Sequence, residues 1–236
     1  MENIEKKLKK IEIDLYNLKL NFSKILSILD KNFNKEIILS LLKERGLKPV
    51  ESDEMKLILP KDERFYDEYF ELLGSYYFRR VLSDMVKKKE FDESFVDKLK
   101  EKWGEKAVKK YLPYIMKYEI IIKKYDKYIS NYYDIDNFGD TLEWYIVKIL
   151  LNEFSIPSIS NVKIKGLSTG GDFDIFFLLL GKLSYLEIKS SPPNNISIEE
   201  IENFIKRVDI INPSVSILFI DTTLNIKRNI IDNMKF

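Results

Sequence analysis

Three charged residues lie on two apolar segments that a short turn joins. Asp174 follows Gly-Gly-Asp-Phe, while Glu187 and Lys189 end the segment Leu-Ser-Tyr-Leu-Glu-Ile-Lys. Side chains alternate along a strand, so Glu187 and Lys189 share one face. Carboxylate oxygens are ligands for hard cations, and a buried charge must be paired or must bind a metal. We therefore expect a site where two acids and a lysine meet, and where a divalent ion could bind.

The turn predicts how the two segments pair. Gly181-Lys182 has the composition of a type II′ hairpin turn, with glycine first. With this turn, Asp174 is opposite Lys189, and Glu187 is its diagonal neighbour at about 7 to 8 Å. The alternative is a structural salt bridge between Asp174 and Lys189, with Glu187 exposed.

Composition excludes several kinds of chemistry. The chain has 236 residues, of which 45% are apolar, so it can bury a core in one or two domains. It has no cysteine, which excludes disulfides and thiolate metal sites, and no histidine, which excludes imidazole bases and ligands. Carboxylates, lysines, tyrosines and oxygen-bound metals remain. The formal charge of +1 means that any nucleic-acid surface must be a local patch.

The first thirty residues have a heptad pattern. Apolar residues recur in alternating steps of four and three, at Ile4, Leu8, Ile11, Leu15, Leu18, Phe22, Ile25 and Leu29. This pattern predicts a long helix over residues 1–30 that forms a homodimer by a coiled coil over residues 4–29. A wider face would also include Ile13 and Leu20, so a helix packed on its own domain is the alternative. The charged start and the absence of a long apolar run predict a cytoplasmic protein.

The N-terminal half is expected to be helical. We predict helices over residues 35–45, 63–88, 91–103 and 105–118, with a short strand at 56–59. A small hairpin over residues 119–130 follows. Helix, turn, helix and wing is the order of a winged-helix DNA-binding module.

Lysines are concentrated in this region. Residues 98–128 contain ten lysines and four acids, a local charge of +6. Phosphate contacts supply DNA affinity that is independent of sequence, so we expect DNA to bind here. The alternative is a solvated lysine-rich face. The expected contacts are Lys102, Lys106, Lys109, Lys110, Lys117, Lys123 and Lys124.

The C-terminal half, residues 134–236, is expected to form a separate α/β domain after a helical region of residues 1–133. We predict a helix over residues 138–150, a strand at 162–167 and then the hairpin. A helix over residues 197–208 starts at the capping box of Ser197 and Glu200, and a strand at 215–220 is buried on both faces. A last helix is expected from Leu224.

This half resembles the PD-(D/E)XK nuclease superfamily, the restriction-endonuclease-like fold, from about Asp134 to Asp221. Asp174 matches the first acid, and Glu187 and Lys189 match the Glu-x-Lys pair. The resemblance implies an α+β protein with an αβββαβ core around a mixed sheet. Glu143 occupies the place of the glutamate that many members carry on the first core helix. Phe173 replaces the usual proline, and Asp172 is the alternative ligand if the strand is bulged.

The resemblance further implies a metal-dependent endonuclease that cuts DNA. Asp174, Glu187 and the Ile188 carbonyl would bind Mg²⁺ or Mn²⁺, and Lys189 would orient the attacking water. Glu143 would be the fourth catalytic residue. Two other functions remain open: a catalytically inactive DNA-binding regulator, and a coiled-coil assembly protein that keeps the nuclease fold.

Overall fold

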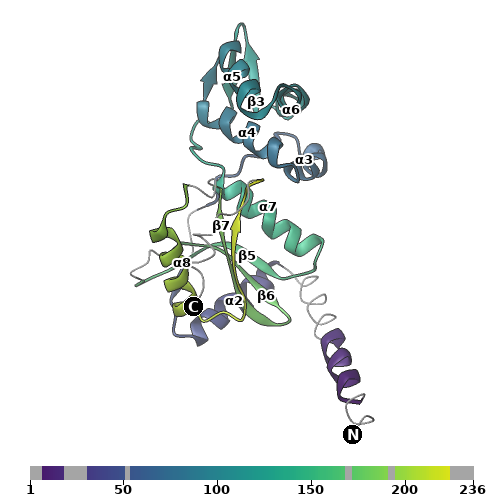
Figure 1. The fold of residues 1–236 in the computed structure, drawn as a ribbon, viewed down its shortest axis with the longest axis vertical. Coiled ribbons are helices and arrows are strands. Elements are labelled where there is room, and N and C mark those ends of the chain that lie inside the picture. The colour runs from purple at the N-terminus through teal and green to yellow at the C-terminus, as the bar shows by residue number, and fades with distance from the viewer. Residues whose placement is uncertain (1–6, 19–30, 51–53, 168–171, 191–194, 224–236) are drawn as a thin grey trace. The chain divides into compact units, whose positions relative to one another are not determined.

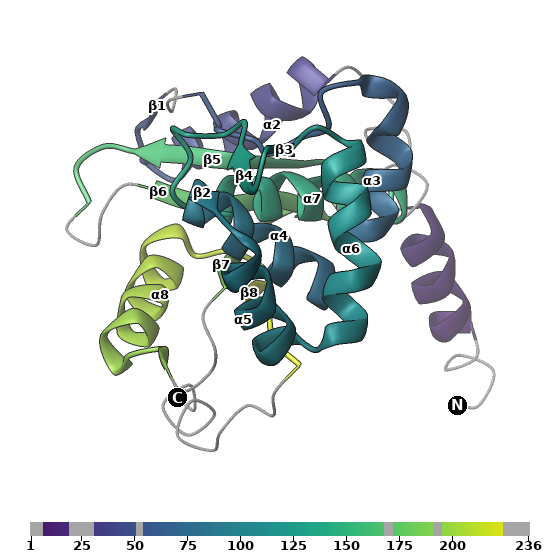
Figure 2. The same cartoon turned by 90° about the horizontal axis from the view of Figure 1, so that it is seen from above.

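A five-stranded mixed sheet contains the three charged residues. The computed structural model describes residues 7–18, 31–50, 54–167, 172–190 and 195–223. The strand order is β1, β5, β6, β7, β8, and all neighbours are antiparallel except β7 and β8, which are parallel. Figure 1 labels β5, β6 and β7, and Figure 2 labels all five strands. The strands are β1 (Pro49–Val50), β5 (Ser158–Ile164), β6 (Asp172–Leu179), β7 (Lys182–Lys189) and β8 (Ser216–Ile220).

Two helices, α2 (Lys31–Glu44) and α8 (Ile198–Ile211), contribute to the same core cluster. The cluster contains residues of α2, β5, β6, β7 and α8, so both helices cover the same face of the sheet. A third helix, α7 (Gly139–Asn152), precedes β5 in the chain. The predicted helices over residues 35–45, 138–150 and 197–208 are thus confirmed.

The start of α8 follows from its sequence. The Ser197 hydroxyl accepts a hydrogen bond of 3.2 Å from the Glu200 backbone N–H, and the Glu200 carboxylate accepts one of 2.8 Å from the Ser197 N–H. This reciprocal pair satisfies two N–H groups that have no partner inside the helix. The predicted capping box is confirmed, and it fixes which residues of α8 face the sheet.

The chain divides into two units. One consists of residues 1–53 and 146–236, and the other of residues 54–145. The division differs from the expected boundary between residues 133 and 134. Helix α2 packs against β5 and β6, so this N-terminal segment belongs to the same unit as the five-stranded sheet. We refer to these as the sheet unit and the helical unit.

The helical unit combines helices with a second, antiparallel sheet of order β2, β4, β3 (Figure 2). The predicted helix over residues 63–88 is divided at Gly74, whereas those at 91–103 and 105–118 are confirmed. Gly104 separates the latter two with a positive φ of 91°. The elements are η1 (Glu63–Phe65), α3 (Tyr66–Leu73), α4 (Tyr76–Lys88), β2 (Glu90–Phe91), α5 (Glu93–Trp103), α6 (Glu105–Lys117), β3 (Ile121–Lys124) and β4 (Lys127–Ser130).

One strand prediction was wrong, and two others are confirmed as strands but corrected in their bounds or burial. Residues 56–59 form no strand, and β5 starts at Ser158, four residues before the predicted start. The strand predicted at 215–220 to be buried on both faces is β8, the last strand of the sheet, with Ile217 39% and Phe219 37% exposed. An apolar run predicts a strand but not its position in a sheet, because that position depends on pairing with distant segments.

Part of the predicted heptad helix is described. Residues 7–18 are helical, and Leu8, Ile11 and Leu15 of the apolar seam are about half exposed. Leu18, the fourth described seam position, is 67% exposed. The other seam positions, Ile4, Phe22, Ile25 and Leu29, lie outside the described residues, as does the predicted helix from Leu224. Dimerisation through residues 4–29 therefore stays a prediction. No helix in the described ranges is long and apolar enough to cross a membrane.

Candidate active site

The turn between β6 and β7 lies one residue earlier than predicted. Leu180 and Gly181 both have positive φ angles, 51° and 76°, and Leu179 pairs with Lys182. Positive φ at both central residues defines a type I′ turn, so the predicted type II′ turn at 181–182 was wrong. A leucine rarely adopts this conformation, which is why composition favoured glycine as the first turn residue.

The corrected turn changes which residues meet. The paired residues end at Ile175 and Leu186, and Asp174 and Glu187 come next on the two strands. Continued by one residue, this register places Asp174 level with Glu187 and not opposite Lys189, as we had predicted. Two carboxylates on adjacent strands form a stronger candidate for a cation site than one carboxylate opposite a lysine.

The strand is irregular at Asp174. Phe173 and Phe176 belong to the same core cluster although they are three residues apart, so strict alternation fails between them. On the adjacent strand, Asn161 has a φ of 55° where the register of β5 and β6 lacks a pair. At this irregularity the Asp174 carboxylate accepts a hydrogen bond of 2.6 Å from the Ile188 backbone N–H.

Asp172, the alternative ligand, lies elsewhere. Its side chain is 72% exposed and pairs with Lys163 at 3.8 Å. Asp174 is half-buried and interacts electrostatically with Glu187. Of the two aspartates, the structure thus places Asp174 beside Glu187.

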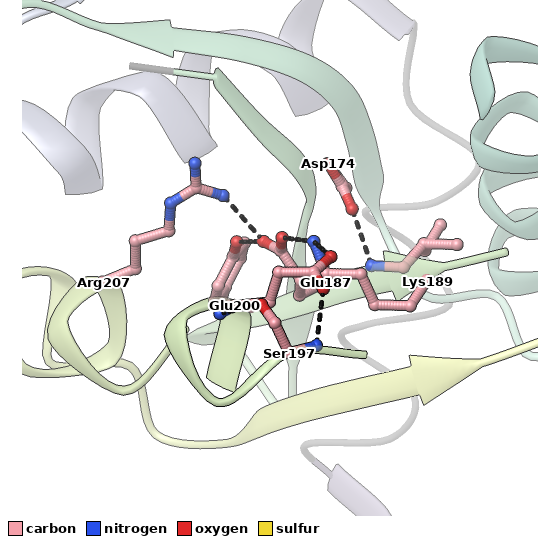
Figure 3. A network of polar contacts seen from close by, with 8 residues as sticks. Asp174, Glu187, Lys189, Ser197, Glu200 and Arg207 are labelled. Atoms are coloured by element: carbon pink, nitrogen blue, oxygen red, sulfur yellow. Dashed lines mark hydrogen bonds and ion pairs between the residues drawn. The ribbon is translucent and has the colours of Figure 1, made fainter. Parts of the chain in front are cut away.

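Glu187 is the centre of a network of polar contacts (Figure 3). It is 4% exposed, and both of its carboxylate oxygens accept hydrogen bonds. Lys189 Nζ lies 2.9 Å from Oε1, and an Arg207 guanidinium nitrogen lies 2.9 Å from Oε2. The Tyr185 hydroxyl also donates to Oε2. A buried carboxylate with this many donors is held in one orientation.

Lys189 connects this network to α8. Its side chain is 22% exposed and lies 3.8 Å from the carboxylate of Glu200 as well as beside Glu187. Glu200 is the capping-box residue, so the start of α8 and the end of β7 are joined through one lysine. Arg207, further along α8, packs its guanidinium over the Phe173 ring at 5.1 Å.

Burial and neighbouring charges shift several pKa values. Burial, together with the negative charge of Glu187, raises the pKa of Asp174 to about 6, although the Ile188 N–H, Lys189 and Arg207 act in the opposite direction. Burial and Glu187 raise the pKa of Tyr185, so its hydroxyl stays protonated and can donate. Burial lowers the pKa of Arg207, but Glu187 and Tyr185 outweigh it and the net direction is upward.

Sequence reasoning missed three members of the network. Tyr185 lies on the same strand face as Glu187, two residues before it on β7. Glu200 and Arg207 are seven residues apart on α8, with the buried Phe204 between them. This helical spacing, counted from the capping box, could have placed Arg207 on the face toward the sheet.

Glu143 belongs to the other unit. It is half-buried on α7, in the part of that helix that belongs to the helical unit, whereas Asp174, Glu187 and Lys189 belong to the sheet unit. Its role as a fourth catalytic residue stays a prediction.

The carboxylate oxygens of Asp174 and Glu187 are suitable ligands for a hard cation. Within the described residues, no three acids come together in a group that could hold a metal ion. Asp174 and Glu187 do come together, and the raised pKa of Asp174 shows that its ionised form is disfavoured in part by the second carboxylate. A cation between them would remove this repulsion.

The predicted lysine patch is partly neutralised. Lys102, Lys109 and Lys117 form ion pairs of 2.6 to 2.7 Å with acids, and Lys123 lies 4.0 Å from Glu93. Lys106, Lys110 and Lys124 are exposed, and no acid of the described chain forms an ion pair with them. These three lysines are the stronger candidates for phosphate contacts.

Two cavities lie in the helical unit and not at the acidic cluster. Their volumes are about 530 and 290 Å³, and both are lined by Lys88, Phe95 and Lys98. Their linings contain lysines and acids in pairs, such as Lys127 with Glu90 at 2.5 Å. The convergence of buried charge instead makes the Glu187 network the stronger candidate site.

Comparison with known proteins establishes the fold class alone. No family model matches the sequence, and no curated protein matches it. The structure is similar to the crystal structure of protein VC1899 from Vibrio cholerae, with a TM-score of 0.50 and 14% sequence identity. The match covers 83% of this chain and 54% of the other, so this chain spans about half the length of that protein. The two share a mixed α+β architecture.

Proposed function

We propose that this chain is a metal-dependent nuclease that hydrolyses phosphodiester bonds of DNA at Asp174, Glu187 and Lys189. The observation that carries the proposal is the proximity of two acids on adjacent strands, since Asp174 interacts with Glu187 and accepts a hydrogen bond from the Ile188 N–H, with a lysine two residues beyond the second acid. One of these acids is almost fully buried, and the pKa of the other is raised to about 6. Perturbed acids of this kind cluster at catalytic sites.

The order of elements supports the same reading. Helix α7 is followed by β5, β6 and β7, then by α8 and by β8, which is parallel to β7. This is the αβββαβ order of the restriction-endonuclease-like core that the sequence resembles. Asp174 lies on the second strand of this order and Glu187 and Lys189 on the third, as the motif requires.

The residues have separate roles in the proposed reaction. Asp174, Glu187 and the Ile188 carbonyl would hold Mg²⁺ or Mn²⁺. The ion would supply positive charge against the negative charge that develops on the scissile phosphate. Lys189, which Glu187 holds at 2.9 Å, would orient the water that attacks phosphorus as the bond to the leaving oxygen breaks. Glu143 remains a proposed fourth residue.

We further propose that the helical unit binds the DNA as a winged-helix module. Its elements run α4, β2, α5, α6, β3 and β4, with a sheet of order β2, β4, β3, which fits the helix-turn-helix and wing arrangement. Lys106 and Lys110 lie on α6, in the place of the recognition helix, and Lys124 lies at the tip of the hairpin. These positions suit contacts to phosphates.

One observation favours a second function, a catalytically inactive DNA-binding protein. Lys189 and Arg207 already compensate the charge of Glu187 without a metal. Such a network could be purely structural. This protein would bind DNA with a steep salt dependence but would not cut it.

A cleavage assay separates the two functions. Labelled single-stranded, duplex and branched DNA, and a matched RNA, are incubated with the protein in Mg²⁺, in Mn²⁺ and in EDTA. We expect cleavage that requires the divalent ion. Binding without cleavage of any substrate would support the inactive regulator.

A further inference from the structure

We infer that Arg207 is a built-in counter-cation that occupies Glu187 when no divalent ion is bound, and so sets the ion concentration at which the site fills. The inference deepens the proposed nuclease function and rests on it. It concerns the regulation of that site by its metal, and it assigns a role to a residue outside the Asp and Glu-x-Lys motif.

The contacts of Glu187 carry the inference. Each of its carboxylate oxygens has a cationic partner at 2.9 Å, Lys189 at Oε1 and Arg207 at Oε2. The Glu187 side chain is 5% exposed and that of Arg207 is 15% exposed, so solvent screens this pair only weakly. A carboxylate this buried would be strongly destabilised without a cation. The network therefore supplies in advance the charge that a metal would bring.

Arg207 and Lys189 are not equivalent in this network. Lys189 lies on the same strand as Glu187 and also approaches a second acid, Glu200, at 3.8 Å. Arg207 comes from α8, a separate element, and pairs with Glu187 at 2.9 Å. Its guanidinium also packs over the Phe173 ring at 5.1 Å. An aromatic ring can bind a guanidinium without a carboxylate. Arg207 can therefore keep its contact with the Phe173 ring when a metal ion replaces it at the Glu187 carboxylate.

The consequence is competition between Arg207 and the ion. A guanidinium stays protonated at all relevant pH values, so its charge always opposes the approach of a divalent cation to Glu187. Removing that charge while keeping a hydrogen-bond donor should strengthen metal binding. It should also destabilise the metal-free protein, because Glu187 then loses a counter-ion.

The test is a titration with Mn²⁺ alone, followed by calorimetry, on four forms of the whole chain: the unaltered protein, Arg207→Gln, Arg207→Lys and Asp174→Asn. Arg207→Gln keeps a donor and removes the charge, and we expect it to bind Mn²⁺ about tenfold more tightly than the unaltered protein. Arg207→Lys keeps the charge and should bind within about twofold. In EDTA, Arg207→Gln should unfold at a lower temperature than the unaltered protein, and saturating Mn²⁺ should narrow this difference.

A second measurement does not depend on the folding of Arg207→Gln. In the unaltered protein, the side-chain Nε–H signal of Arg207 is followed by NMR and assigned by its loss in Arg207→Lys. Addition of Mg²⁺ should shift this signal, because the ion and the guanidinium share Glu187. An Arg207 signal that does not move while Mg²⁺ binds would overturn the inference.

The outcomes also separate this inference from the proposed function. Mn²⁺ binding that is lost in Asp174→Asn but unchanged or weakened in Arg207→Gln would overturn the role of Arg207 and leave the nuclease proposal in place. Absence of Mn²⁺ binding in all variants would overturn both. Tighter binding in Arg207→Gln that still requires Asp174 would support both.

Discussion

The Asp174 carboxylate accepts a hydrogen bond of 2.6 Å from the backbone N–H of Ile188, so the first acid is attached to the strand that carries the second. This contact requires Asp174 to lie at the end of the paired region and to turn toward β7. It also positions a half-buried carboxylate beside the charge of Glu187, which helps to raise the pKa of Asp174 to about 6.

The raised pKa of Asp174 predicts a dependence of stability on pH. The folded protein holds a proton on Asp174 up to about pH 6, whereas the ordinary value is 3.8, so the Asp174 contribution to stability falls as pH rises between these values. The cost above pH 6 is up to about 3 kcal/mol. In EDTA, Asp174→Asn should therefore be more stable than the unaltered protein at pH 8.

The same variant supplies its own control. The stability difference between Asp174→Asn and the unaltered protein should shrink as pH falls from 6 to 4, because the aspartate is then neutral in the folded protein. Chemical denaturation at several pH values measures it. A difference that does not depend on pH would contradict the raised pKa.

Cleavage should depend on Asp174 and not on Asp172. Asp174→Asn removes a proposed metal ligand and should lower metal-dependent cleavage at least about a hundredfold, whereas Asp172→Asn, on the same strand but 72% exposed, should have little effect. Initial rates with Mn²⁺ and duplex or single-stranded DNA measure both. If only Asp172→Asn is inactive, Asp172 and not Asp174 is the metal ligand.

Lys189 should be required for cleavage but not for folding. Lys189→Ala removes the group that would orient water, so we expect cleavage to be abolished while the circular dichroism spectrum and DNA affinity stay unchanged. Lys182→Ala is the matched control, because Lys182 is an exposed lysine at the other end of β7. Undiminished cleavage by Lys189→Ala would contradict the proposal that these residues form a nuclease site.

The hairpin turn should be sensitive to the residue at position 181. Gly181 has a φ of 76°, and an added Cβ would meet no atom within 4 Å, so alanine there adds backbone strain without a clash. We expect Gly181→Ala to lower the free energy of unfolding by about 1 kcal/mol. Leu180→Asn is the opposite test, since asparagine tolerates the φ of 51° found at Leu180 and suits a type I′ turn. It should stabilise the protein or leave it unchanged.

The lysines without ion pairs should dominate DNA binding. Replacing Lys106, Lys110 and Lys124 together with glutamine should reduce the slope of log affinity against log salt by roughly three. Replacing the ion-paired Lys102, Lys109 and Lys117 with glutamine is the control, and this change should reduce the slope less. Fluorescence anisotropy with a labelled duplex measures both slopes. Equal slopes for the two sets would contradict a dedicated phosphate surface on α6 and the β3–β4 hairpin.

Local patterns predicted most of the elements. The capping box of Ser197 and Glu200 located the start of α8, and Gly104 located the junction of α5 and α6, because both signals depend on a few neighbouring residues. The predictions failed where pairing decides the result. The β8 strand is apolar in composition, yet it is the last strand of the sheet, and the start of β5 depends on β6.

The sequence by itself determined which chemistry is open to this protein: without histidine or cysteine, any catalysis would have to use carboxylates, lysines, tyrosines and oxygen-bound ions. It also determined that Glu187 and Lys189 share a strand face, because alternation is a local property of the backbone. The tertiary structure decided the partners. The left-handed conformation of Leu180 placed the turn one residue earlier than predicted, which shifts each cross-strand partner by two residues and brings Asp174 level with Glu187 instead of Lys189. The packing of α8 on the sheet brought Arg207 to Glu187, because a contact across 20 residues depends on how whole elements pack.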